Sequence, residues 1–491
     1  MRSRIALSVV LATLTSCALG PDFKRPPAPP AGSYGSVANP QIGAAAAVAG
    51  GSPQSLVTGQ DIPRDWWTLF RSPELSSLVE QSLKANPDLA AARASLRQAH
   101  ELYLAQRASF FPTVQGGFSA TRAKNPLATI ANPTSLPQTD PYYDLYTAQL
   151  SVSYLPDVFG ATRRAVEAAK AQAASARFQY EATYVTLSSN VVVTAIEEAS
   201  LRAQIATTER LAALQHQVTQ TVRGQRKLGT ANNFDVLTQE TAEAQTLATL
   251  PPLRKQLGQT RDALTALLGR LPADEPKDSF RLEELALPTE LPLSLPSKLV
   301  EQRPDVRQAE ENLHAASAEV GVALTDMLPQ FALSADLGSS ALGLRQLFGP
   351  YTGFWTAGAS LTQTLFDGGA LIHRKRAADA ALDEAGAQYR AAVILAFQNV
   401  ADTLRALQAD GDALKASAEA DRAAKAAFDL AQRQHALGTI TFVAVLNAEQ
   451  AYRQAELALI QAQASRYSDT AALFQALGGG WWNRSVGDLH D

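Results

Sequence analysis

ATRRAVEAAKAQAASARFQY (161–180) opens a run that contains no proline and extends from Ala161 to Leu228, with Gly224 as its only glycine. A helix over this whole run would be about 100 Å long at the usual rise per residue. It would be several times longer than the mean α-helix, which has about 11–12 residues. Helices of this length need a partner along their whole side. The run therefore predicts a coiled coil or a barrel of helices, with an ordinary elongated bundle as the alternative.

The motif that ends this run occurs twice, and so do its neighbours. Leu228-Gly229-Thr230 returns in the second half as Leu437-Gly438-Thr439. Asn86-Pro87-Asp88-Leu89 is echoed by Arg303-Pro304-Asp305-Val306, at a slightly larger spacing along the chain. We interpret the chain as an internal two-fold repeat, because a regular spacing between similar motifs is typical of duplicated units. The difference between the two spacings indicates a longer exposed loop in the first half, within the Pro- and Asn-rich residues 125–143.

The repeat sets the predicted domain organisation. The first repeat covers 61–285 and the second covers 286–480, with a C-terminal tail at 481–491. Each repeat contains a long helix that ends at a glycine turn, where a return helix begins. The other helices are short, so two short helices stacked end to end match one long helix in length. The predicted helices are 76–108, 161–228, a return helix from about Asn233, 370–437 and 441–477, with hairpin tips at 228–231 and 437–440.

Four runs of about ten residues alternate between apolar and polar side chains, as transmembrane strands do. One of them interleaves Phe331, Leu333 and Ala335 with polar or small residues. Half-buried strands of a soluble sheet have the same period, which leaves that interpretation open. Four strands cannot close a membrane barrel, and lipid tolerates no open edge, so chains must pool their strands. Two copies would supply eight strands and a filled interior, whereas three would supply twelve and a lumen. The predicted strands are 113–122, 145–155, 331–340 and 354–364.

The N-terminus has the pattern of an exported lipoprotein. Arg2 and Arg4 precede a short apolar run that ends in Leu14-Thr15-Ser16-Cys17, and Cys17 is the only cysteine of the chain. The run is too short to span a bilayer and is typical of a secretory signal, which predicts a signal peptide at 1–16 and lipidation of Cys17. Residues 17–60 are rich in proline, glycine and alanine and are predicted to be a lipid-anchored tether. The alternative for Cys17 is a buried, inert thiol.

Composition and motifs argue against several other classes of protein. The formal net charge is −4, which gives no indication of a nucleic-acid surface. The six histidines are scattered, and none is spaced for a metal site. No phosphate-binding or nucleophile motif occurs, and no stretch after the signal is apolar enough to be a transmembrane helix. We therefore expect no enzyme, no cofactor and no metal.

Together, these motifs resemble the TolC-like outer membrane factors of the NodT/OprM lipoprotein branch. The resemblance rests on the lipobox with the following Gly20-Pro21-Asp22-Phe23, on residues 66–75, on Leu365-Phe366-Asp367-Gly368-Gly369 and on the two Leu-Gly-Thr turns. It implies a mainly α fold with a β-barrel portion. In that fold a homotrimer builds a 12-stranded outer-membrane barrel, four strands per chain, continuous with a long periplasmic α-helical barrel.

The resemblance also implies a function and partners. Such proteins are the exit ducts of tripartite efflux pumps that export small molecules such as drugs. The duct would be lipid-anchored in the outer membrane, extend into the periplasm, and work with a periplasmic adaptor and an inner-membrane transporter of the RND type. It would bind no nucleic acid. Type I protein secretion is an alternative within the channel class, and a structural periplasmic coiled-coil lipoprotein is the alternative from another class.

The candidate site residues lie at the two hairpin tips. In the family the equivalent turns meet the adaptor, although glycine turns also simply close helical hairpins. Family members often close the periplasmic end with aspartates after the second turn. Here Ala444 and Asn447 occupy those positions, whereas Asp235 follows the first turn and His435 precedes the second. We hypothesise that His435 and Asp235 form a latch between hairpins that is strongest at low pH. The residues assigned to adaptor contact are Leu228, Gly229, Thr230, Leu437, Gly438 and Thr439, and those assigned to the gate are Asp235, His435 and Asn447.

Overall fold

The computed structural model is mainly helical and describes residues 18–30, 33–35, 41–43, 46–124, 142–276 and 280–484. The chain forms two compact units, which are described separately. The strand unit comprises Met1–Arg25, Arg97–Ala174 and Glu310–Gln388, and the helix unit comprises Pro26–Leu96, Ser175–Ala309 and Tyr389–Asp491. Over the described ranges, no helix is both long and apolar enough to cross a membrane.

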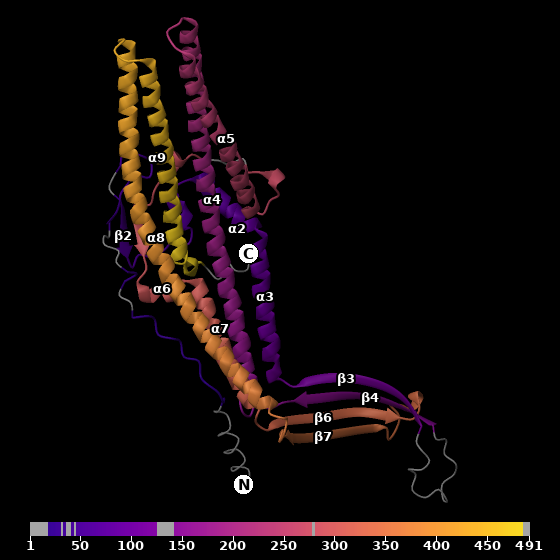
Figure 1. Ribbon diagram of the computed structural model, residues 1–491. Coiled ribbons are helices and arrows are strands. Elements are labelled where there is room, and N and C mark those ends of the chain that lie inside the picture. Colours follow the sequence, from indigo (N-terminus) through magenta and orange to yellow (C-terminus); the bar gives the residue numbers. More distant parts are fainter. Residues whose placement is uncertain are drawn as a thin grey trace, which may run out of the picture. The chain divides into compact units, whose positions relative to one another are not determined.

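The strand unit is built on one antiparallel sheet. Its strands are β3 (Thr113–Lys124), β4 (Tyr142–Tyr154), β6 (Gln330–Ala341) and β7 (Gly353–Thr362), in the order β3-β4-β6-β7. The four arrows lie side by side in Figure 1. They occupy the four alternating runs of the sequence, with some ends extended, while β4 and β7 end one and two residues earlier than predicted. Alternation predicts such strands well because each pleat turns successive side chains to opposite faces.

Two long helices and two return helices form the hairpins seen in Figure 1. The long helices are α4 (Ala161–Lys227) and α8 (Ala370–Ala436), and the return helices are α5 (Asn233–Leu267) and α9 (Phe442–Ala476). Aspartates fix the start of both long helices. Asp157 accepts hydrogen bonds from the backbone N–H groups of Thr162 and Arg163, and Asp367 accepts from those of Gly369, Ala370 and Leu371. These bonds satisfy N–H groups that a helix start leaves without partners.

The short helices break where the sequence places a proline. The predicted helix 76–108 is two helices, α2 (Pro73–Ala85) and α3 (Pro87–Arg107), with Asn86 between them. The Asn86 side chain accepts hydrogen bonds from the backbone N–H groups of Asp88 and Leu89, so it caps α3 as proline begins it. In the second half, α6 (Pro296–Gln302) and α7 (Pro304–Thr325) break in the same way.

A small sheet in the helix unit was not predicted. It pairs β1 (Gln41–Ile42) with β2 (Gln54–Thr58), and β2 with β5 (Glu290–Leu293). The first two strands lie inside the segment that the sequence assigns to a tether at 17–60. β5, which belongs to the second half of the chain, supplies the backbone partners of β2, and β2 in turn pairs with β1. Several short 3-10 helices complete the fold: Trp66–Phe70, Ala108–Phe110, Pro272–Asp274, Leu282–Glu284, Leu344–Gln346 and Trp481–Asn483.

Candidate functional site

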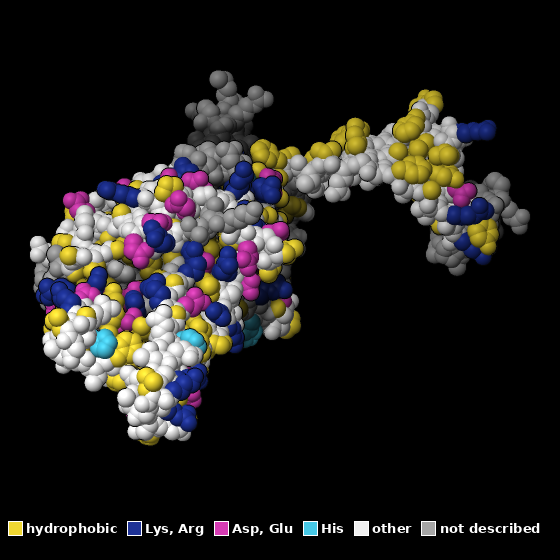
Figure 2. Space-filling view, turned by 90° about the horizontal axis from the view of Figure 1, so that it is seen from above, with side chains coloured by type: hydrophobic (Ala, Val, Ile, Leu, Met, Phe, Trp, Pro, Cys, Tyr) yellow, Lys and Arg dark blue, Asp and Glu magenta, His cyan; other side chains and the backbone are white. Residues whose placement is uncertain are grey.

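One face of the four-stranded sheet is apolar and exposed. Leu150 lies opposite Leu337, and Leu337 lies opposite Trp355, so one row of large apolar side chains crosses three strands. Trp355 is 75% exposed and Leu337 is 62% exposed. Val114 and Phe118 add to the same face from β3. Figure 2 shows hydrophobic side chains at the surface along this four-stranded sheet. A soluble sheet buries such a face, whereas none of the residues that the structure describes covers this row of side chains.

The opposite face of the sheet is polar and internally hydrogen-bonded. Asp336 accepts hydrogen bonds from the hydroxyls of Ser151 on β4, at 2.6 Å, and Thr356 on β7, at 3.1 Å. The hydroxyls of Thr147 and Ser340 are 3.0 Å apart across the same seam. An apolar face backed by a polar, hydroxyl-rich face is typical of a strand wall between lipid and a water-filled interior.

The two outer strands of this sheet have one neighbour each. β3 pairs only with β4, and β7 pairs only with β6, within the described part of the chain. Each outer strand therefore presents a row of backbone N–H and C=O groups along its free edge. Such edges can be closed by another chain.

The two hairpin tips have the same local structure. At the first tip the backbone N–H of Thr230 and its hydroxyl both donate to the carbonyl of Gln225, at 3.0 Å each. At the second tip Thr439 donates in the same two ways to Gln434, at 3.0 and 2.9 Å. The glycines take positive φ angles, +77° at Gly229 and +72° at Gly438, which other residues rarely adopt.

These turns leave one leucine at each tip in solvent. Leu228 is 81% exposed and Leu437 is 80% exposed. A side chain added at Gly229 or Gly438 would meet no atom within 4 Å. The two tips thus present the same arrangement: an open turn, a threonine that closes the turn and an apolar side chain that projects from it.

The gate candidates lie near these tips, and each is bound within its own hairpin. Asp235 forms a capping box with Asn232: its Oδ2 accepts from the Asn232 backbone N–H, and its own N–H donates to the Asn232 side chain. The Nδ1 atom of His435 is 3.1 Å from the carbonyl oxygen of Ile440, and its ring lies beside Phe442. Asn447 is exposed on α9. No hydrogen bond joins Asp235 to His435 in the described chain, and the latch remains a prediction.

Ion pairs and a small apolar cluster hold the hairpins together. Arg223 pairs with Glu240, and His216 with Glu243, both at 2.7 Å and both between α4 and α5. The hydrogen bond from His216 holds the pKa of Glu243 below its usual range. The cluster joins the two hairpins: it contains Val218, Val222, Val236 and Leu446. Surface pairs of this kind contribute little individually, so the cluster matters more for alignment of the hairpins.

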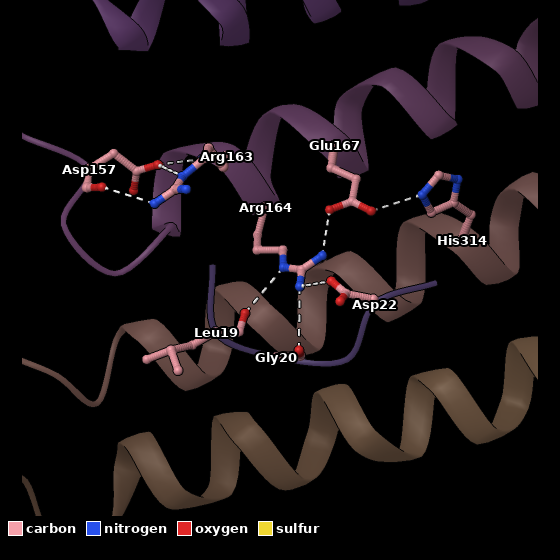
Figure 3. A network of polar contacts seen from close by, with 8 residues as sticks. All are labelled: Leu19, Gly20, Asp22, Asp157, Arg163, Arg164, Glu167 and His314. Atoms are coloured by element: carbon pink, nitrogen blue, oxygen red, sulfur yellow. Dashed lines mark hydrogen bonds and ion pairs between the residues drawn. The ribbon is translucent and has the colours of Figure 1, made fainter. Parts of the chain in front are cut away.

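The residues that follow Cys17 are docked in the strand unit. Cys17 itself lies outside the described residues. The guanidinium of Arg164, nearly buried, donates to the carbonyls of Leu19 and Gly20 and to the carboxylate of Asp22, as Figure 3 shows. A side chain at Gly20 would meet the backbone of Gly321, because the two glycines allow close approach. The segment after Cys17 is therefore held in place at its start.

This docking network extends to a histidine. Glu167 accepts from Arg164 at 2.8 Å and contacts His314 at 3.0 Å (Figure 3), and the His314 ring stacks on Phe23. Although burial raises the pKa of Glu167, the hydrogen bonds from Arg164 and His314 hold it below its usual range. No local sequence pattern marks this network, because its members come from three distant segments.

A second polar cluster lies in the helix unit, around the small sheet. Arg466 on α9 is fully buried and donates to the carbonyl of Ser52 at 2.9 Å and to the Gln54 side chain at 3.4 Å. Close to Arg466, the carboxyl group of Asp410 on α8 faces that of Asp469 on α9. Burial and then the Asp469 carboxyl raise the pKa of Asp410 to about 7, against the opposing effect of Arg466.

This cluster predicts a pH dependence of stability. Asp410 has a higher pKa folded than its unfolded value of about 3.9, so its stabilising contribution is full below the unfolded value and is lost as pH rises toward 7. We expect Asp410→Asn to raise the melting temperature at pH 8 by roughly 2–4 °C and to flatten the profile from pH 5 to 8. Asp412→Asn, at an exposed position on the same helix, should leave the profile unchanged. Melting curves followed by circular dichroism would decide; equal profiles for both variants would contradict the assignment.

No metal site emerges from the residues that the structure describes, since no three His, Cys, Asp or Glu side chains gather to hold an ion. The prominent features are instead an exposed apolar sheet face, two free strand edges and two matching hairpin tips.

Comparisons with known proteins agree on one family. Residues 78–270 and 295–479 match the family model described as outer membrane efflux protein. The toluene efflux pump outer membrane protein TtgF of Pseudomonas putida is 30% identical over 487 residues, which cover 98% of this chain and 97% of TtgF. The pyoverdine export outer membrane protein OpmQ of Pseudomonas putida is 30% identical over 418 residues, covering 85% of this chain and 88% of OpmQ. The solved structure of the outer-membrane channel OprN superposes with a TM-score of 0.81 at 28% identity, covering 95% of this chain and 100% of that one.

Proposed function

Because this chain belongs to the outer membrane efflux protein family, we propose that it forms the exit duct of a tripartite pump that exports small molecules across the outer membrane. The observation that carries this proposal is the four-stranded sheet, with one exposed apolar face and two free edges. Lipid would cover the apolar face, and the polar face with Asp336 would line a water-filled interior.

The proposed assembly is a homotrimer with a shared 12-stranded barrel. Four strands cannot close on themselves in lipid, whereas twelve enclose a lumen. An internal two-fold repeat would match a helical barrel of equivalent hairpins. The long helices α4 and α8 both have 67 residues, and the return helices α5 and α9 both have 35 residues. Each chain would thus contribute two equivalent hairpins to a ring of twelve helices in the periplasm.

The hairpin tips are the proposed contact with a periplasmic adaptor, behind which an inner-membrane transporter of the RND type supplies the energy. Leu228 and Leu437 project from turns of the same structure, so one repeated adaptor surface could bind all tips of the ring. Asp235, His435 and Asn447 lie close enough to the tips to take part in gating.

A lipid attached to Cys17 would anchor the protein to the membrane in addition to the strand barrel. The network around Arg164 supports this part of the proposal, because it fixes residues 19–22 and therefore limits how far an acylated residue 17 can move. The range of substrates is proposed to be broad, since the relatives TtgF and OpmQ are named for cargoes as different as toluene and pyoverdine.

The proposed function is tested by a variant that should impair binding to the adaptor while leaving the assembled channel intact. In a strain that lacks its own duct, the wild-type chain should restore resistance, and Leu228→Asp/Leu437→Asp should reduce it about tenfold or more, as loss of central apolar contacts does in other interfaces. Both proteins should conduct ions in planar bilayers once opened. Leu247→Asp, at an exposed position on α5 away from the tip, is the matched control. A wild-type protein that neither conducts nor restores resistance would refute the proposed function.

A further inference from the structure

A covering segment, residues 342–352 between β6 and β7, folds back onto the apolar face of the sheet. Ser339 and Ala341 point to that face, because they alternate in step with Leu337 along β6. Both are buried, whereas Leu337 is exposed. The Ser339 hydroxyl donates to the carbonyl of Leu347, which is itself buried. The covering segment therefore lies over the end of the apolar face that is farthest along β6.

The backbone of the covering segment is hydrogen-bonded within the protein. The Thr352 hydroxyl lies 3.1 Å from the carbonyl oxygen of Leu347 and 2.8 Å from that of Gly349. The backbone N–H of Ser340 donates to the Thr352 carbonyl at 2.9 Å. Backbone groups beside lipid must find such partners, because lipid tails offer none. Phe348, in contrast, is 82% exposed. The segment is thus suited to apolar surroundings.

An open pocket of about 730 Å³ lies between the covering segment and the strands. It is lined by Phe118 of β3, Leu150 of β4, Leu337 of β6 and Phe348 of the covering segment. Among the described residues that line it, no side chain is charged. Volumes of about 300–1,000 Å³ with a mostly apolar lining are typical of ligand sites. The part of a ligand that enters this pocket must therefore be apolar.

Beyond the pocket, the same face of the sheet becomes basic. Arg122 and Lys124 alternate in step with Phe118 along β3, and Arg122 lies about 13 Å farther along the strand. Arg122 is 74% exposed, and its guanidinium is 3.8 Å from the Asp144 carboxylate. The Lys124 ammonium lies over the Tyr142 ring, 5.3 Å from its centre. Both cations remain accessible to an anion in front of the sheet.

The covering segment adds a third cation. Arg345 is exposed and lies three residues before Phe348, in a turn that continues to Gly349, whose N–H donates to the carbonyl of Gln346 at 2.8 Å. Side chains three residues apart in a helical turn lie on the same side. The covering segment contains no acidic residue. Figure 2 shows Lys and Arg side chains beside hydrophobic ones at the end of the sheet far from the helices. An apolar pocket close to cations fits an amphiphile with an anionic head.

Building on the proposed membrane channel, we propose that this pocket binds one acyl chain of a membrane lipid whose phosphate group is bound by Arg345, Arg122 and Lys124. Lipid elsewhere on the apolar face contacts the strands on one side only. A chain in the pocket contacts the strands and also Phe348 of the covering segment, so it is held at a fixed position.

The position of the pocket favours lipid over a second copy of this chain. The lining strands have β4 at their centre, between β3 and β6. A further strand added at either edge of the sheet would lie beside these strands and not over them. The pocket opens on the apolar face, which faces lipid in the proposed channel.

Native mass spectrometry of the detergent-solubilised assembly tests the site. The probes are phosphatidylglycerol and a diacylglycerol with the same acyl chains, which lacks the phosphate. The wild type should retain phosphatidylglycerol, up to one molecule per chain, and bind the diacylglycerol about tenfold more weakly, because cations near a membrane surface attract anionic lipid. Arg345→Gln should weaken the binding of phosphatidylglycerol about fivefold and leave that of the diacylglycerol unchanged.

Two further variants test the pocket. Gly116→Leu places a side chain in it, where a first carbon atom would meet Leu150 at 3.7 Å, an ordinary contact. It should weaken the binding of both lipids about tenfold, as the loss of about two buried methylene groups would. Phe348→Ala, at an exposed position, should act in the same direction and serves if Gly116→Leu does not assemble. Ala357→Leu, on the apolar face of β7 outside the pocket, is the matched control and should bind as the wild type does.

The same preparations are measured for ion conductance in planar bilayers, which separates this inference from the proposed function. A conducting wild type that retains neither lipid, or that loses none when Gly116 or Phe348 is replaced, overturns the site and leaves the duct intact. Equal binding of phosphatidylglycerol and diacylglycerol overturns the assignment of the phosphate to the three cations. A chain that neither assembles nor conducts overturns both the site and the proposed function.

Discussion

Replacing Arg484 with alanine should lower the free energy of unfolding by about 3–5 kcal/mol, the usual cost of leaving one partner of a buried ion pair alone. The Arg484 guanidinium lies 2.7 Å from the Glu181 carboxylate, and the two side chains are only 6% and 3% exposed. The guanidinium also lies over the Tyr184 ring, at 4.0 Å from its centre. The substitution would leave a buried carboxylate on α4 without its charge partner.

The loss should depend on pH with a defined sign. Burial raises the pKa of the Glu181 carboxyl even with Arg484 beside it, and the variant would raise it further. An acid with a raised folded pKa stabilises the fold most below its unfolded pKa and loses that contribution as pH rises. The deficit of Arg484→Ala should therefore be smallest near pH 4 and largest above pH 7, as measured by urea unfolding in detergent.

Two controls separate this effect from a general loss of arginine. Arg281 pairs with Glu284 at 3.0 Å, but its side chain is 77% exposed, so Arg281→Ala should cost less than about 1 kcal/mol. The double variant Glu181→Gln/Arg484→Met should recover much of the stability, because it removes both charges together. If Arg484→Ala and Arg281→Ala are equally stable, the ion pair between Arg484 and Glu181 does not contribute to stability as a buried ion pair.

The sequence predicts the parts of the fold that rest on local patterns. The absence of breakers from 161 to 228 predicts α4 to within one residue of its end, because helix formation depends on near neighbours and on the glycine that stops it. Alternation likewise locates the four strands of the strand unit. Both signals are local, and both recur in the second half.

The contacts that the sequence did not predict join distant segments. Glu181 and Arg484 are 303 residues apart, and the sequence assigns Arg484 to a tail at 481–491. Arg164 belongs to a long charged helix, and nothing in its neighbours marks it as the residue that holds the segment after Cys17. Single-sequence patterns report which face of an element is buried, but not which other element covers it. The adjacent tryptophans at 66–67 were a usable signal, since two large aromatic side chains outside the long predicted helices indicate a core at that point.

That core provides the second large prediction: Phe474→Ala should cost about 3–5 kcal/mol. Phe474 on α9 is fully buried and stacks on Trp66, with ring centres 5.1 Å apart and planes inclined by 16°. Trp66 and Phe70 come from the N-terminal part of the chain, and Phe70 also lies beside Tyr467 on α9. The substitution opens a cavity between two segments from opposite ends of the sequence. Phe234→Ala, 76% exposed at the first hairpin tip, should change stability by less than about 0.5 kcal/mol.

Phe474→Ala should also destabilise the small sheet of β1, β2 and β5. Hydrogen exchange can measure this loss of stability. Gln54 on β2 donates to the Thr470 hydroxyl of α9 at 3.2 Å, and Arg466 of α9 donates to the carbonyl of Ser52. If α9 shifts into the cavity, these bonds weaken together, since the buried groups have no water to replace their partners. Amides of β2 and of the C-terminal part of α9 should lose protection in the same step, while those of β3 and β4 keep theirs. Loss confined to α9 would mean that the small sheet is held by β5 alone, and that the N-terminal segment folds independently of this core.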